Sequence, residues 1–134
     1  MEKEEHVPEN AIFCCFGCMS SVGTLTGMAV LEAYKKLNTE KNGLFCISAI
    51  AAGVPKHRKT TEQAKRIIVV DGCYNKCATK ILEKDGFKVD RSLNLTQDLK
   101  LPKIGPFKPF AYSEEDLKMT VDEIMKLCGD NETK

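Results

Sequence analysis

The apolar run Ile-Ile-Val-Val at residues 67–70 constrains the fold most, because four consecutive β-branched residues favour a strand over a helix. Asp71-Gly72 ends the run with residues that are typical of turns. A strand without polar alternation is buried on both faces, which is characteristic of parallel sheets covered by helices. Three further short runs are expected to form strands, at residues 11–14, 44–47 and 87–90.

The longest predicted helix follows the first strand. Ser20 or Ser21 is a suitable N-cap, and apolar residues recur at helical spacing from there to about Leu37. Gly23 and Gly27 lie inside this helix, although glycine lowers helix propensity. The two glycines therefore indicate that another segment packs closely against the helix.

Two later helices have recognisable end signals. Asn75 is a suitable N-cap for a helix over residues 76–85. Ser113 and Asp116 have the spacing of a capping box, which starts a last helix that ends at Gly129.

The alternation of strands and helices predicts an α/β fold. We expect a small three-layer sandwich with a mostly parallel central sheet of about four strands and helices on both faces. Residues 1–10 are expected to form an exposed leader, and residues 11–134 a single domain. Within that domain, residues 54–60 are expected to be a loop and residues 61–65 a short helix.

Charge and hydropathy exclude several classes of partner. The net charge is +1, which gives no reason to expect a nucleic-acid partner. No apolar run approaches the roughly 20 residues of a membrane helix, so no membrane partner is expected. The acidic N-terminus lacks the apolar segment of a signal peptide, and the cytoplasm is the expected location.

The seven cysteines are many for a chain of 134 residues. In a reducing cytoplasm, cysteines are more often metal ligands or reactive thiols than disulfides. The loops after parallel strands meet at one edge of the sheet, where ligands usually bind. Five cysteines are expected at this edge: Cys15, Cys18, Cys46, Cys73 and Cys77.

The spacing of these cysteines suits a zinc ion. Cys15 and Cys18 are separated by two residues, and Cys73 and Cys77 by three, so each pair can reach one metal. Four such sulfurs would make a Cys₄ zinc site, with Cys46 as a fifth candidate. A position at a helix start would also favour the thiolate form of Cys77.

The remaining candidates have simpler interpretations. Cys128 lies on an apolar helical stripe, and Cys14 alternates with its neighbour along the strand, so both are expected in the core. His6 and His57 lie in polar segments and are expected to be solvated. Asp71 is expected to cap the turn after its strand, with support of the site's ligands as the sharper alternative.

The motif Asp71-Gly72-Cys73 after the apolar strand, with Cys77 following, resembles the DGC-domain family, to which zinc binding is ascribed. Cys15-Phe16-Gly17-Cys18 resembles the Cys- and Gly-rich N-terminal loop of that family, and Phe45-Cys46 resembles its central strand. The resemblance covers most of residues 11–90. It implies a zinc ion held by cysteines among the five candidates and implies no reaction.

Two functions from different classes remain open. The first is zinc binding, with a metal that is structural, carried or catalytic. The second is thiol redox or sulfur-transfer chemistry by a low-pKa cysteine at a helix start. A phosphatase-like Cys-x5-Arg loop is disfavoured, because Ser21 and Thr24 stand where the arginine would follow Cys15 or Cys18.

Overall fold

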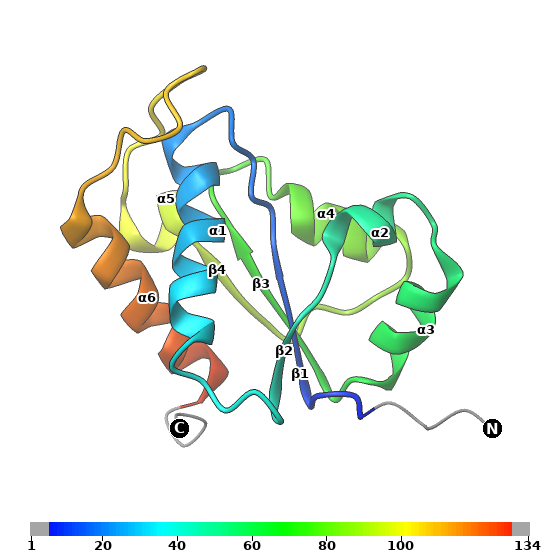
Figure 1. Ribbon diagram of the computed structural model, residues 1–134. Helices are drawn as coiled ribbons and strands as arrows, with labels where there is room; N and C mark the ends of the chain where they lie inside the picture. The colour runs from blue at the N-terminus through cyan, green and yellow to red at the C-terminus, as the bar shows by residue number, and fades with distance from the viewer. Residues whose placement is uncertain (1–5, 130–134) are drawn as a thin grey trace.

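The computed structural model describes residues 6–129, which form a four-stranded parallel sheet between two layers of helices (Figure 1). The strand order is β2-β1-β3-β4, and every neighbouring pair is parallel. This confirms the predicted α/β class and the central parallel sheet. The strands are β1 (Asn10–Cys14), β2 (Asn42–Leu44), β3 (Arg66–Asp71) and β4 (Arg91–Asn94).

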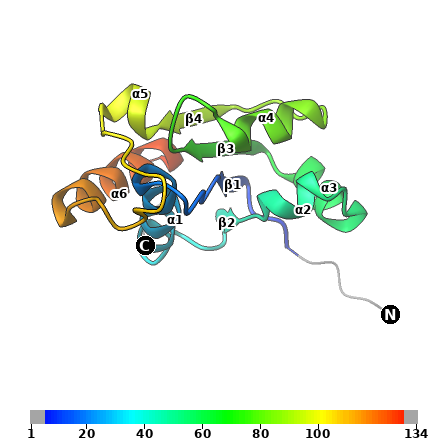
Figure 2. The same cartoon turned by 90° about the horizontal axis from the view of Figure 1, so that it is seen from above.

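The helices cover both faces of the sheet, as predicted, and Figure 2 shows the layers from above. One layer contains α1 (Ser21–Tyr34), α5 (Leu95–Leu99) and α6 (Glu114–Cys128). The other layer contains α2 (Ile47–Ala51), α3 (Pro55–Gln63) and α4 (Cys77–Lys84). No helix within residues 6–129 is both long enough and apolar enough to span a bilayer.

Strand β3 shows why the sheet must be covered twice. Ile68 and Val70 pack into the core beneath α1 and α6, whereas Ile67 and Val69 pack into the core beneath α2 and α4. Successive side chains of a strand point to opposite faces, so a continuous apolar run supplies both cores. The sheet is thereby fixed as a rigid base for the loops at its carboxyl edge.

The second strand is shorter than predicted. Strand β2 ends at Leu44, and α2 already begins at Ile47, so Cys46 is the N-cap of a helix instead of a strand residue. Helix α3 also begins earlier than the predicted helix at residues 61–65. Pro55 occupies its first turn, where the missing N–H group costs no hydrogen bond.

The ends of other elements also differ from prediction in specific ways. The fourth strand is Arg91–Asn94 instead of residues 87–90. Asp90 explains the shift. Its carboxylate accepts a hydrogen bond from Ile67 N at 2.8 Å, so the regular pairing with β3 begins only at Arg91. The buried residue Asn10 already belongs to β1, although it was assigned to the leader, of which residues 1–5 lie outside the described part.

Candidate functional site

A cavity of about 500 Å³ lies where β1 and β3 end. It lies at the N-termini of α1 and α4, and the segment between α5 and α6 forms one of its walls. Its lining residues come from three separate loops of the chain. They are Cys15, Gly17, Cys18, Met19, Ser20 and Gly23, then Gly72, Cys73, Asn75 and Cys77, and finally Lys103, Gly105 and Pro106.

Four of the five candidate cysteines line this cavity: Cys15, Cys18, Cys73 and Cys77. The two cysteine pairs, about 60 residues apart in the chain, therefore meet at one edge of the sheet, as the parallel topology predicts. Cys46 is not among the lining residues: it follows the edge strand β2, whereas the cavity lies at the ends of the central strands β1 and β3.

The first cysteine loop is pressed against α1. A Cβ atom on Gly23 would lie 1.9 Å from the carbonyl oxygen of Gly17, and one on Gly27 would lie 2.3 Å from the Phe16 ring. Both glycines thus permit the close approach that their presence in the helix predicts. Phe16 itself has a φ of 44°, in the left-handed region, so the chain turns sharply between Cys15 and Gly17.

Thr26 holds this loop by hydrogen bonds. Its hydroxyl accepts from Phe16 N at 3.0 Å and donates to Gly23 O at 2.7 Å. Cys15 Sγ lies 3.7 Å from the same hydroxyl. The sequence carries no clear signal for this role of Thr26, because Ser21, Thr24 and Glu32 are also polar residues of the same helix.

The second cysteine loop is organised by Asp71. Its carboxylate is buried and accepts from Ala78 N at 3.0 Å, from Thr79 N at 3.2 Å and from the Thr79 hydroxyl at 2.6 Å. Asp71 was expected to cap the turn after its strand. It instead caps the helix that follows this turn, because its donors lie in the first turn of α4. The prediction of Asn75 as N-cap is wrong, because the N-cap position belongs to Lys76, whose side chain makes no cap bond.

The same loop is fastened on two further sides. A Cβ atom on Gly72 would lie 2.9 Å from the backbone of Val22, so the turn packs directly on α1. Asn94 Nδ2 donates to Cys73 O at 2.7 Å, and the Thr96 hydroxyl donates to Gly72 O at 2.7 Å. The sequence gives no signal for Asn94 or Thr96, since they reach the loop only through the pairing of β4 with β3.

Burial acts against ionisation of the thiols of Cys14, the last residue of β1, and of Cys15, which follows it. Burial raises the pKa of the Cys15 thiol, although the backbone of Gly17, the Thr26 hydroxyl and the backbone of Gly72 act in the opposite direction. Burial, with the nearby Cys15, also raises the pKa of Cys14 from 9.0 to about 12. Cys14 packs against the core beneath α1, as predicted, and Cys128 is buried in that core.

Cys46 has the opposite environment. It is exposed, and the Ser48 hydroxyl, 3.1 Å from its sulfur, lowers the pKa of the thiol together with the backbone of Ala49. A lowered pKa makes a thiol more reactive at neutral pH. This reactivity lies outside the cavity.

The donor set of the cavity fits zinc in its chemistry, since thiolates are common zinc ligands. The side chains do not converge: residues 6–129 contain no group of three or more His, Cys, Asp or Glu side chains placed to hold one ion. Cys18 instead donates to Phe16 O at 3.3 Å, and Cys15 faces Thr26. Closing a metal site would therefore require rotation of cysteine side chains that already border the same space.

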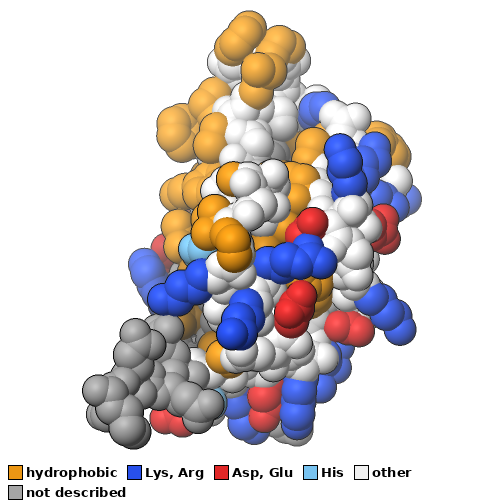
Figure 3. Space-filling view, turned by 90° about the vertical axis from the view of Figure 1, so that its right-hand side faces the viewer, with side chains coloured by type: hydrophobic (Ala, Val, Ile, Leu, Met, Phe, Trp, Pro, Cys, Tyr) orange, Lys and Arg blue, Asp and Glu red, His pale blue; other side chains and the backbone are white. Residues whose placement is uncertain are grey.

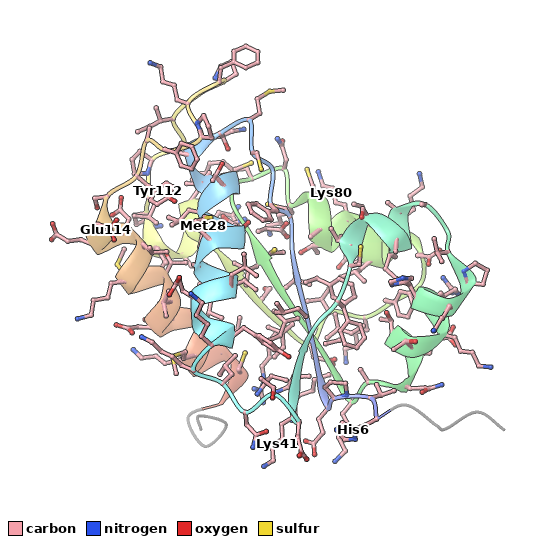
Figure 4. The ribbon with its side chains drawn as sticks, viewed as in Figure 1. His6, Met28, Lys41, Lys80, Tyr112 and Glu114 are labelled. Carbon is pink, nitrogen blue, oxygen red and sulfur yellow. The ribbon has the colours of Figure 1, made fainter. Side chains whose placement is uncertain are left out.

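The histidines lie away from this site. His6 is at the opposite end of the sheet (Figure 4), where its Nε2 lies 2.7 Å from Glu40 O. His57 is part of α3 and does not line the cavity. The polar side-chain groups that line the cavity, among residues 6–129, are four thiols, the Ser20 hydroxyl, the Asn75 amide and the Lys103 ammonium.

Comparison with known proteins gives one result. The family model of the DGC domain matches residues 11–124, which is most of the chain. No curated protein and no solved structure matches the chain. The match contains both cysteine loops, the Asp71-Gly72-Cys73 turn and most of α6. The chain belongs to the DGC-domain family.

Proposed function

We propose that this domain binds one zinc ion through Cys15, Cys18, Cys73 and Cys77. The supporting observation is that these four thiols, contributed by two distant loops, line one cavity at the carboxyl edge of the sheet. A set of four sulfurs is typical of structural zinc sites. Cys46 is omitted from the proposed ligands because it lies outside the cavity.

Zinc binding requires two changes in the first loop. Cys18 must release the carbonyl of Phe16, and the half-buried Cys15 must lose its proton. The backbones of Gly17 and Gly72, which already favour the thiolate form of Cys15, would stabilise that sulfur after deprotonation. A bound zinc ion would link the β1–α1 loop to the β3–α4 loop.

Metal analysis of the full chain, purified without added metal, tests the proposal. We expect about one zinc per chain. Cys15→Ser and Cys77→Ser should each lower zinc affinity by at least about a hundredfold, since even residues that only orient ligands contribute tenfold to a hundredfold. The measurement is competition with a chromogenic chelator at fixed pH.

Cys46→Ser is the matched control, because it removes a thiol that is exposed, as that of Cys77 is, but that lies outside the cavity. Its zinc content and affinity should equal those of the unmodified chain. A fully folded chain that contains no zinc and takes up none from solution would contradict the proposal, as would a loss of zinc in the Cys46 variant alone.

Thiol chemistry is the second candidate, and the lowered pKa of Cys46 favours testing it. In the metal-free protein, iodoacetamide is expected to modify Cys46 first, because it is exposed and its thiol ionises more readily. Cys128 should react last because it is buried, and Cys14 and Cys15 should also react slowly, since burial raises the pKa of both thiols. Mass spectrometry of a labelling time course gives the order.

A cavity cysteine that reacts faster than Cys46 would instead support a nucleophile within the cavity. Cys46→Ser is again informative, because it should remove the fastest phase completely and leave the others unchanged. If the fastest phase persists in that variant, a cysteine other than Cys46 is the most reactive thiol, and thiol chemistry becomes the preferred function over zinc binding.

A further inference from the structure

The end of the molecule that contains the cavity has no carboxylate in the segments that form it. Between Glu9 and Glu32 the sequence contains no acidic residue, and between Asp98 and Glu114 it contains none either. The β3–α4 loop follows Asp71, whose carboxylate is buried and hydrogen-bonded. The net charge of +1 for the whole chain therefore conceals a locally positive end.

The cations at this end are lysines in the exposed loops. The segment between α5 and α6 contributes Lys100, Lys103 and Lys108, and the β3–α4 loop contributes Lys76, all of them exposed. No ion pair involves any of these four among residues 6–129. Four unneutralised ammonium groups on one end attract anionic surfaces.

Large apolar side chains project from the same loops. The exposed fraction is 80% for Phe107, 73% for Phe110 and 62% for Met19, and Ile104 is also exposed. Single exposed apolar side chains need no explanation, but several on neighbouring loops indicate an interaction surface. These four residues are called the apolar tip below.

The tip is held in place by hydrogen bonds. Phe107 N donates to Met19 O at 2.8 Å, and Ser21 N donates to Ile104 O at 2.8 Å. Ser21 Oγ accepts from Ile104 N at 2.9 Å and so closes a second link. Phe107 has a φ of 66°, a conformation that non-glycine residues rarely adopt. The two loops thus form one structured projection.

The shape of this end is convex. The segment between α5 and α6 rises above the helix layers in Figure 1, and hydrophobic side chains cap the summit in Figure 3. The apolar tip projects outward with lysines in the same loops, whereas the cavity beside it is lined mostly by cysteines and glycines (Figure 1). The tip matches a soft anionic surface, into which aromatic side chains insert while lysines contact the headgroups.

We propose that this end of the domain docks peripherally onto an anionic lipid bilayer, with the apolar tip inserted at the interface. Such docking requires no spanning helix, so it is compatible with the helices described above. The expectation of no membrane partner rested on the lack of a long apolar run, which does not report how exposed apolar and basic side chains are arranged. Because Lys103 and Pro106 also line the cavity, docking would place the cavity mouth at the lipid surface.

Vesicle flotation of the full chain tests this proposal. The chain should float with phosphatidylcholine vesicles that contain phosphatidylserine, and binding should weaken as salt is raised. Vesicles of phosphatidylcholine alone should bind at least about tenfold more weakly. The double variant Lys103→Gln with Lys108→Gln should lose about thirtyfold in affinity, at about fivefold for each lysine.

The double variant Phe107→Ser with Phe110→Ser should lose at least about tenfold, since two exposed rings no longer insert. Leu31→Ser and Lys59→Gln are matched controls, because they change exposed residues on α1 and α3 and should bind as the unmodified chain does. Circular dichroism should show that all variants are folded, as every substituted side chain is exposed.

Failure of the unmodified chain to bind anionic vesicles would overturn the proposal. So would equal binding by the Phe107 and Phe110 double variant. Analytical ultracentrifugation covers a further alternative: if the chain self-associates through the tip and ignores vesicles, a second copy is the partner and the membrane assignment is wrong. Each measurement is made both on the protein as purified and on metal-free protein, so that lipid binding is tested separately from zinc binding.

Discussion

Asp71→Ala is expected to lower the free energy of unfolding by about 3 kcal/mol, because it leaves three donors at the start of α4 without their acceptor. The carboxylate is 3% exposed, so water cannot replace these bonds without opening the structure. Urea unfolding, followed by circular dichroism, measures the change. The first turn of α4 should fray and displace Cys77, so zinc affinity should fall with stability.

Two variants define the cause of this effect. Asn75→Ala should change the free energy of unfolding by less than about 0.5 kcal/mol, since Asn75 is exposed and is not the N-cap. Asp71→Asn keeps one acceptor and should cost less than Asp71→Ala. Equal losses for Asn75→Ala and Asp71→Ala would show that Asp71 is not the group that caps the helix.

Gly23→Ala is expected to destabilise the protein by about 2–3 kcal/mol, although alanine is the better helix former. The new methyl group would lie 1.9 Å from Gly17 O, a backbone atom that cannot rotate away. The β1–α1 loop must therefore move, and Cys15 and Cys18 move with it. We expect both lower stability and weaker zinc binding, measured by urea unfolding and chelator competition.

Gly17→Ala is the matched control at the other side of the same contact. A Cβ atom on Gly17 would meet no atom within 4 Å, so the change in stability should stay within about 0.5 kcal/mol. If Gly23→Ala instead stabilises the protein by the roughly 1 kcal/mol that helix propensity predicts, the loop does not pack against α1 as described.

These two contacts act on different halves of one site. Asp71 fixes the direction of α4 and so the place of Cys77, whereas Gly23 sets how closely the loop with Cys15 and Cys18 approaches α1. Gly72 joins the halves by packing on the backbone of Val22. Loss of either contact should therefore separate thiols that are not adjacent in the chain.

Local sequence determined the longer elements and their order, but it predicted neither of the five-residue helices α2 and α5. The apolar run at residues 67–70 could only be a strand buried on both faces, and Ser20, Ser113 and Asp116 place helix starts through hydrogen bonds within four residues. Because helices separate successive strands, each connection is long enough for the crossover that joins parallel strands, and the sheet is expected to be parallel. The parallel arrangement also brings the two cysteine pairs to one sheet edge, since the carboxyl ends of parallel strands coincide.

Only the tertiary structure decided which groups share the cavity. Cys46 lies outside the site because it follows the edge strand β2, and the strand signal at residues 44–47 does not reveal the strand order. Asp71, and not Asn75, caps α4, since a residue at the end of a buried strand reaches a helix start across a turn of five residues. The wall with Lys103 and Pro106 arrives from a segment with no local signal. Periodicity and capping are short-range properties, whereas cavity membership depends on contacts between residues far apart in the chain.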